Sequence, residues 1–285
     1  MKSLTYLLKT FSPADWIILI YNFSILSFLF FSQNKTSEFG YFISIHLLII
    51  IWVLSLTWNN NLQKTKLNQW LKLWYPLFTL IWFIPELSLL QKLYVTRNFN
   101  PELLLVETTL FPQRYYFTMP LTFSPILLEI FHGVIISFFF LLLIPAWLKR
   151  RINDKIVKEY VFIITFSTIC HFWIALLIPV HGPADLRLEL FPEGFFFIPI
   201  ANFLTGSFFQ SGATISSLLV TLGVIITAYV SKLFPKIHRL MILWLFLLLI
   251  STVICTFHYS VSAMGGMLTG LLFLSGGKKL YEKTY

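Results

Sequence analysis

Eight long apolar segments follow one another along the chain with few charged residues inside them. They cover residues 16–31, 41–58, 74–90, 126–147, 160–180, 214–234, 240–257 and 259–274. A helix needs roughly 20 mostly apolar residues to cross about 30 Å of hydrocarbon, so we expect each segment to form a transmembrane helix. The sequence therefore predicts an all-α fold: a polytopic membrane bundle of about eight spans.

The composition supports this interpretation. Of the 285 residues, 57% are hydrophobic and only 12% are charged, whereas a soluble domain has about 45–50% apolar and about 25% charged residues. A soluble chain of this length needs far more polar surface around its core. The composition therefore excludes a soluble enzyme, a disordered protein and a nucleic-acid-binding protein. Membrane lipids are the expected partners, and the sequence identifies no protein partner.

Basic residues predict how the bundle is oriented. The loops on one side of the predicted membrane hold five of the 21 Lys and Arg residues, and the other 16 lie on the opposite side. Because cytoplasmic loops carry the excess of Lys and Arg, we expect both termini in the cytoplasm. The long loops 91–125 and 181–213 then face the extracytoplasmic or lumenal side. Their prolines, aromatic residues and amphipathic stretches are typical of segments that lie along the membrane interface.

Several polar side chains occur within or near the spans, where they are costly. We expect Glu86 to reach the lipid head groups and His46 and His171 to be packing residues. Glu129 and His132 share one helix face, because they are three residues apart, and an intrahelical pair lining a cavity is plausible. A transporter is the weaker interpretation, because we find neither paired broken helices nor in-membrane charges. The six histidines are scattered, so the sequence predicts no metal site and no cofactor.

Three polar segments fall on the same predicted side of the membrane. The first is residues 179–187, with the sequence Pro-Val-His-Gly-Pro-Ala-Asp-Leu-Arg. The second is residues 209–214, Phe-Gln-Ser-Gly-Ala-Thr, and the third is residues 256–266, Thr-Phe-His-Tyr-Ser-Val-Ser-Ala-Met-Gly-Gly. We expect these segments to converge at the outer end of the bundle.

With these motifs, the chain resembles the type 2 phosphatidic acid phosphatase superfamily, and within it the inositol phosphorylceramide synthase branch. The resemblance covers roughly residues 95–275, including the segments 107–111 and 129–132. It implies a phosphatidic acid phosphatase-like membrane domain at 95–275, preceded by N-terminal transmembrane helices at 1–94. Residues 276–285 would form a cytoplasmic tail.

The resemblance also implies roles for individual residues. His258 corresponds to the histidine that attacks phosphorus. Ser262 stands where the family has the aspartate that orients this histidine, and Ala213 where it has the histidine that protonates the leaving oxygen. Ser211 and Gly212 keep the family's residues. Independently of the resemblance, residues 262, 266 and 270 are small and spaced by four, which is typical of close helix packing.

Arg187 and His181 complete the expected site, as residues that bind the phosphate of a lipid head group. Losing a general acid typically costs a factor of about 10²–10⁴ in rate, and losing the carboxylate that orients a histidine costs about 10⁴ in a comparable pair. One hypothesis is therefore a relative with lost or altered activity that binds a phosphorylated lipid head group. The alternative is an active lipid phosphatase or phosphotransferase with His258 as the nucleophile.

Overall fold

The predicted apolar segments form helices in a computed structural model that describes residues 10–31, 38–62, 65–94, 97–147, 154–208 and 215–284. Eight helices occupy the positions of the predicted spans. They are α2 (Pro13–Phe31), α3 (Phe39–Leu62), α4 (Lys66–Tyr94), α7 (Pro125–Trp147), α8 (Asp154–Leu177), α11 (Leu218–Leu233), α12 (His238–Ile254) and α13 (Ser260–Thr284).

Seven of these eight helices are long and apolar enough to cross a membrane, and α11 is the exception. Its 16 residues extend about 24 Å at 1.5 Å per residue, short of the roughly 30 Å of hydrocarbon. The helix starts later than expected because Ser217 is its N-cap and its side chain accepts a hydrogen bond from the Val220 amide. The described residues thus form an integral, multi-pass membrane protein with seven candidate spans.

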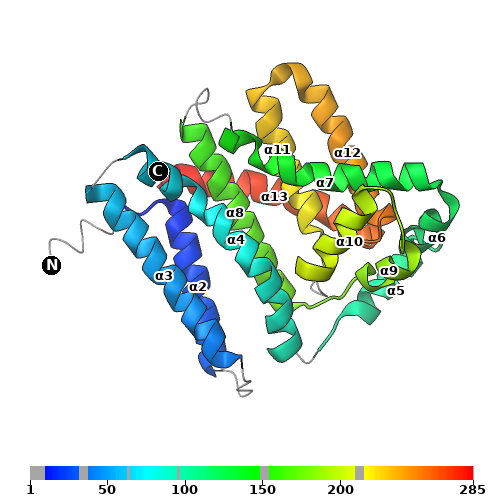
Figure 1. Cartoon of the computed structure of the whole chain (residues 1–285), viewed down its shortest axis with the longest axis horizontal. Helices are drawn as coiled ribbons and strands as arrows, with labels where there is room; N and C mark the ends of the chain where they lie inside the picture. The colour runs from blue at the N-terminus through cyan, green and yellow to red at the C-terminus, as the bar shows by residue number, and fades with distance from the viewer. Residues whose placement is uncertain are drawn as a thin grey trace.

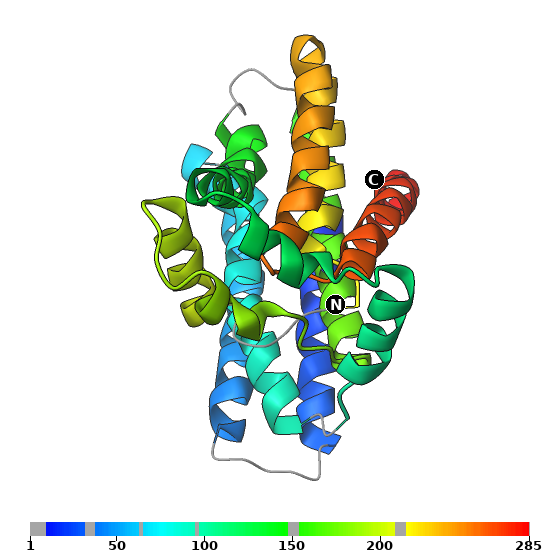
Figure 2. The same cartoon turned by 90° about the vertical axis from the view of Figure 1, so that its right-hand side faces the viewer.

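Figures 1 and 2 show how the helices are arranged. Helices α2, α3, α4 and α8 run side by side at one end of the molecule, and α11 and α12 form a hairpin at the other. Helices α7 and α13 cross this arrangement and flank the hairpin, α7 against α12 and α13 against α11. The N-terminal helices are joined to the rest mainly through α8, which packs against α2 and α4 on one side and against α11 and α13 on the other.

The core lies along α8 and α11. In the most apolar stretch of α8, 72% is buried inside the protein, whereas the corresponding share is 33% in α3 and in α12. The small residues of α13 allow α11 to approach closely. A Cβ atom at Gly266 would lie 2.6 Å from the Ser217 carbonyl oxygen, and one at Gly270 would lie 2.8 Å from the Val224 Cβ. The predicted small-residue stripe is confirmed as a helix-packing surface.

The two long loops contain short helices. Residues 91–125 include α5 (Asn100–Leu110) and α6 (Tyr115–Thr122). Residues 181–213 include the 3₁₀ turn η1 (Ala184–Leu186), α9 (Arg187–Leu190) and α10 (Phe197–Phe208). A second 3₁₀ turn, η2 (Pro235–Ile237), joins α11 to α12. The short helices α5, α6, α9 and α10 gather near the end of the α11–α12 hairpin at which α13 begins (Figure 1).

Candidate functional site

The turn between α12 and α13 carries His258. Helix α12 ends with the Phe257 amide donating to the Thr252 carbonyl (2.9 Å), and Thr256 adopts a left-handed conformation with φ of 57°. Glycine is usual at this point of a helix ending, and a β-branched residue there is strained by about 1–3 kcal/mol. The Thr256 hydroxyl donates to the Tyr116 carbonyl in α6 at 3.1 Å, and this bond helps to hold the turn that places His258.

Arg187, at the start of α9, reaches this turn. Its side chain is 1% exposed. The guanidinium donates from Nη1 to the Cys255 carbonyl and from Nη2 to Asn202 Oδ1 (3.0 Å), and Nη2 lies 3.3 Å from His132 Nε2. Its carbon Cζ lies 4.1 Å from the centroid of the Phe257 ring. Arg187 is therefore held against the residues that immediately precede His258.

No carboxylate among the described residues forms an ion pair with Arg187. Within the same part of the chain, its Nε is buried without a hydrogen-bond partner. Burial lowers the pKa of the guanidinium to about 10, so it stays protonated at neutral pH. A buried charge normally has a charged partner. This position therefore combines a fixed positive charge with an unused donor.

Glu129 and His132 do not form the intrahelical pair that their spacing suggested. The Glu129 carboxylate accepts hydrogen bonds from the amides of residues 195–198, at the beginning of α10. His132 Nδ1 lies 2.7 Å from the Leu128 carbonyl, which can only accept, so Nδ1 carries the proton and Nε2 faces Arg187 as an acceptor. Free amides at the beginning of a helix favour a carboxylate, and α10 supplies them.

Glu107 has the same role at the beginning of α13. This fully buried residue of α5 accepts hydrogen bonds from the amides of Ser260 (3.1 Å) and Val261 (2.9 Å). The carboxylate satisfies the first free amides of α13 and complements the positive end of its dipole. Glu107 thereby fixes the start of the helix two residues beyond His258.

His258 is half-buried, and its pKa is lowered to about 4 by burial and by the nearby His171. The imidazole is therefore neutral at pH 7. Ser262, on the first turn of α13, is 2% exposed, and its carbonyl accepts a hydrogen bond from the Ser217 amide at 2.8 Å. The beginnings of α11 and α13 are thus joined directly, with His171 of α8 beside them.

The remaining predicted residues are placed as follows. His181 is half-buried in the segment before η1, and its Nδ1 has no hydrogen-bond partner within the described part of the chain. Ser211, Gly212 and Ala213 lie outside the described residues. The structure therefore places Arg187 against the turn that carries His258 and leads into α13. On the α11 side, the described residues begin at position 215.

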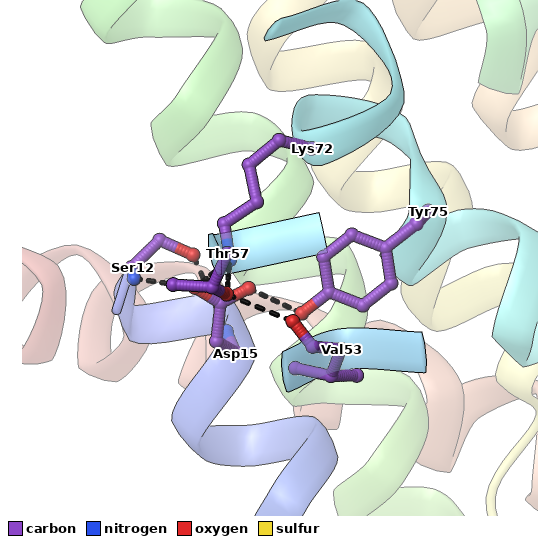
Figure 3. Close-up of polar contacts among 6 residues, drawn as sticks. All are labelled: Ser12, Asp15, Val53, Thr57, Lys72 and Tyr75. Atoms are coloured by element: carbon purple, nitrogen blue, oxygen red, sulfur yellow. Dashed lines mark hydrogen bonds and ion pairs between the residues drawn. The ribbon is translucent and has the colours of Figure 1, made fainter. Parts of the chain in front are cut away.

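The sequence reasoning missed a buried ionic cluster where α2, α3 and α4 meet, which Figure 3 shows. Lys72 Nζ lies 2.7 Å from Asp15 Oδ2 and also donates to Thr57 Oγ1. The Tyr75 hydroxyl donates to the other Asp15 oxygen. Ser12 caps α2, and its amide donates to Asp15 at 2.6 Å. A Ser followed three residues later by an acidic residue is a helix-start signal, but it does not reveal a partner 57 residues away.

Glu86 corrects a second expectation, because it does not reach the head groups. It is 1% exposed, and its Oε1 lies 2.8 Å from His46 Nε2. His46 Nδ1 in turn lies 2.7 Å from Asn22 Oδ1. His46 is therefore more than a packing residue. Together with Asp15 and Lys72, this pair shows that the candidate spans do contain buried ionisable side chains in contact with one another.

Comparisons with known proteins returned no relatives: no family model matches the chain, and neither curated proteins nor solved structures match it. Among the described residues, no group of three or more His, Cys, Asp or Glu side chains is placed to hold a metal ion.

Proposed function

We propose that this membrane protein binds the phosphorylated head group of a lipid at Arg187 and His258, on the extracytoplasmic or lumenal side. The observation that supports this most strongly is the buried guanidinium of Arg187, which has no carboxylate partner among the described residues and an unused Nε. Arginine suits phosphate because its planar donors match the oxygens and its charge persists at all relevant pH values.

The surroundings of Arg187 fit an anion of this kind. Its protein partners are neutral: a carbonyl, an amide oxygen and an imidazole nitrogen. They orient the guanidinium without neutralising it. A phosphate beside it would gain a strong interaction, because charge pairs are screened weakly away from water. The neighbouring His258 is neutral at pH 7 and offers one donor and one acceptor.

We further propose that ordinary phosphoryl turnover is lost or altered. The resemblance to the type 2 phosphatidic acid phosphatases assigns the general acid to position 213, which is alanine here, and the orienting carboxylate to position 262, which is serine. An alanine transfers no proton, and a serine supplies no charge to an imidazolium. Phosphoryl transfer depends on both positioning and charge stabilisation, so these two changes remove much of the catalytic equipment.

One observation favours the alternative, an active phosphatase or phosphotransferase. The low pKa of His258 keeps the imidazole unprotonated at neutral pH, and an unprotonated imidazole is the form that attacks phosphorus. Release of phosphate or head group from phosphatidic acid and inositol phospholipids separates the two candidates. Equal rates for the wild type and His258→Ala support binding alone, whereas loss of release only in the variant supports the alternative.

Binding of phosphatidic acid to the purified protein in nanodiscs tests the proposed function. We expect Arg187→Gln to weaken binding by at least tenfold, because a charge-assisted contact contributes about 1.5–3 kcal/mol. Arg97→Gln is the matched control, since Arg97 is exposed and paired with Glu102. Diacylglycerol, which lacks the phosphate, should bind the wild type and Arg187→Gln equally. An unchanged affinity for phosphatidic acid in a folded Arg187→Gln variant would contradict the proposal.

A further inference from the structure

A hydroxyl and an imidazole are paired at the junction of α8 and α11. His171 Nδ1 lies 2.9 Å from the Ser167 carbonyl, and its Nε2 lies 2.9 Å from Ser216 Oγ. A carbonyl oxygen only accepts, so Nδ1 carries the proton and Nε2 of the neutral ring accepts one. The imidazole is thus oriented by a third group and directed at a serine hydroxyl, which is the arrangement that activates serine nucleophiles.

Thr221 also lies near this imidazole but has another acceptor. Its Oγ1 is 3.2 Å from His171 Nε2, yet its hydroxyl donates to the Gly266 carbonyl at 3.0 Å. A hydroxyl has one proton to donate. Ser216 is therefore the donor to Nε2, at the shorter distance.

The pair adjoins the candidate site. The residue after Ser216 donates its amide to the Ser262 carbonyl, and a Cβ atom at Gly265 would lie 3.3 Å from the Ser216 Cβ. His171 also influences the charge of His258. Ser216 is 4% exposed and follows Ile215, which is 40% exposed. The pair therefore lies beside the first turn of α13, which begins two residues after His258.

We propose that Ser216 and His171 form a nucleophile–base pair that transfers the acyl group of a lipid ester. This inference rests on the proposed function, because Arg187 would hold the phosphate of the same lipid. It is distinct from the phosphohistidine chemistry that the resemblance implies for His258. In a glycerophospholipid the acyl esters lie only a few bonds from the phosphate, so a lipid held by its phosphate at Arg187 also brings an ester to this part of the protein.

The acyl transfer proceeds in two stages. The Ser216 oxygen attacks the ester carbonyl carbon while its proton passes to His171 Nε2. The bond between the carbonyl carbon and the alkyl oxygen breaks, and Nε2 returns the proton to that leaving oxygen. Water, or the hydroxyl of a second lipid, then attacks the acyl-serine and gives its proton to Nε2. The bond between the acyl carbon and Ser216 breaks, and Nε2 returns that proton to the Ser216 oxygen.

Covalent labelling with an alkyl fluorophosphonate, followed by peptide mass spectrometry, tests this pair in the full-length protein in nanodiscs. We expect one adduct, on Ser216, formed at least about 100-fold more slowly in His171→Gln, as expected for loss of a general base. Ser251→Ala is the control, because the Ser251 hydroxyl is buried with no hydrogen-bond partner among the described residues, so this variant should label like the wild type. In the wild type, labelling should decline as acid protonates the imidazole, at pH values where thermal denaturation shows that the protein is still folded, so that loss of the fold is not the cause.

Absence of an adduct on Ser216 in the folded wild type would overturn the proposal. Equal labelling in His171→Gln, or labelling of the wild type that does not depend on pH, would do so as well. The pH profile needs no variant, so the test survives if His171→Gln fails to fold. The probe has no anionic head group, whereas the proposed function is read from phosphatidic acid binding, so the two failures are distinguishable.

Discussion

Lys72 and Arg187 are two largely buried cations with different neighbours. Lys72 lies 2.7 Å from the carboxylate of Asp15. Arg187 is at least as buried but is surrounded by neutral acceptors. Burying an unpaired charge is costly, and the chain avoids this cost at Lys72. The lack of a carboxylate partner for Arg187 among the described residues is consistent with the proposed binding of an anion there.

The acid sensitivity of folding tests the environment of His258. Its pKa in the folded protein is about 4, below the ordinary 6.5, so the unfolded chain takes up this proton first as the pH falls. The neutral imidazole therefore stabilises the fold above pH 6.5, and this contribution is lost between pH 6.5 and 4. We expect about 1–2 kcal/mol of this loss to disappear in His258→Gln, allowing for partial solvent screening. Thermal denaturation of both proteins over that range measures it, and identical pH profiles would contradict the assignment.

Sequence reasoning identified some site residues and could not identify others. Arg187 and His258 were predicted as site residues through the resemblance to a phosphatase superfamily, which no comparison tests, and not through a local pattern of their own. The pairing of His171 with Ser216 joins residues 45 positions apart, and no local pattern indicates it. Glu107 was included in the resemblance only as the first residue of the segment 107–111, and its capping role was not predicted because the amides that it caps belong to another helix.

At the scale of elements, hydrophobic length predicted where the helices lie. It overestimated α11, which is central and well buried and so can be apolar without spanning the membrane. It underestimated α4, which begins at Lys66, eight residues before the predicted span at residue 74. The extra turns bring Lys72 to Asp15, which explains why this cluster was missed.

The ionic cluster of α2, α3 and α4 should contribute strongly to folding. Asp15→Asn leaves Lys72 without its counter-charge, and breaking a buried pair costs about 3–5 kcal/mol. We expect about 3 kcal/mol, because the Lys72 side chain keeps 11% exposure and can reach toward water. The double variant Asp15→Asn/Lys72→Met removes both charges and should recover part of this loss. Thermal denaturation in detergent compares the variants, and a double variant no more stable than Asp15→Asn would refute the ion-pair explanation.

At the scale of the whole molecule, the distribution of basic residues predicts that the candidate site and the C-terminus lie on opposite sides of the membrane. Single cysteines at two exposed positions test this with an impermeant maleimide: Gln113→Cys between α5 and α6, and Lys283→Cys near the end of α13. We expect Gln113→Cys to react in intact cells and Lys283→Cys to react only after permeabilisation. The reverse pattern would place the site in the cytoplasm.

The central claim is that a lipid phosphate occupies the space beside Arg187. Solid-state NMR tests it by measuring the dipolar coupling between ³¹P of bound phosphatidic acid and ¹⁵N of labelled arginine side chains in nanodiscs. The account predicts strong coupling to one guanidinium, assigned by its disappearance in Arg187→Lys and its persistence in Arg97→Gln. Coupling that is absent, or that survives in Arg187→Lys, would contradict it.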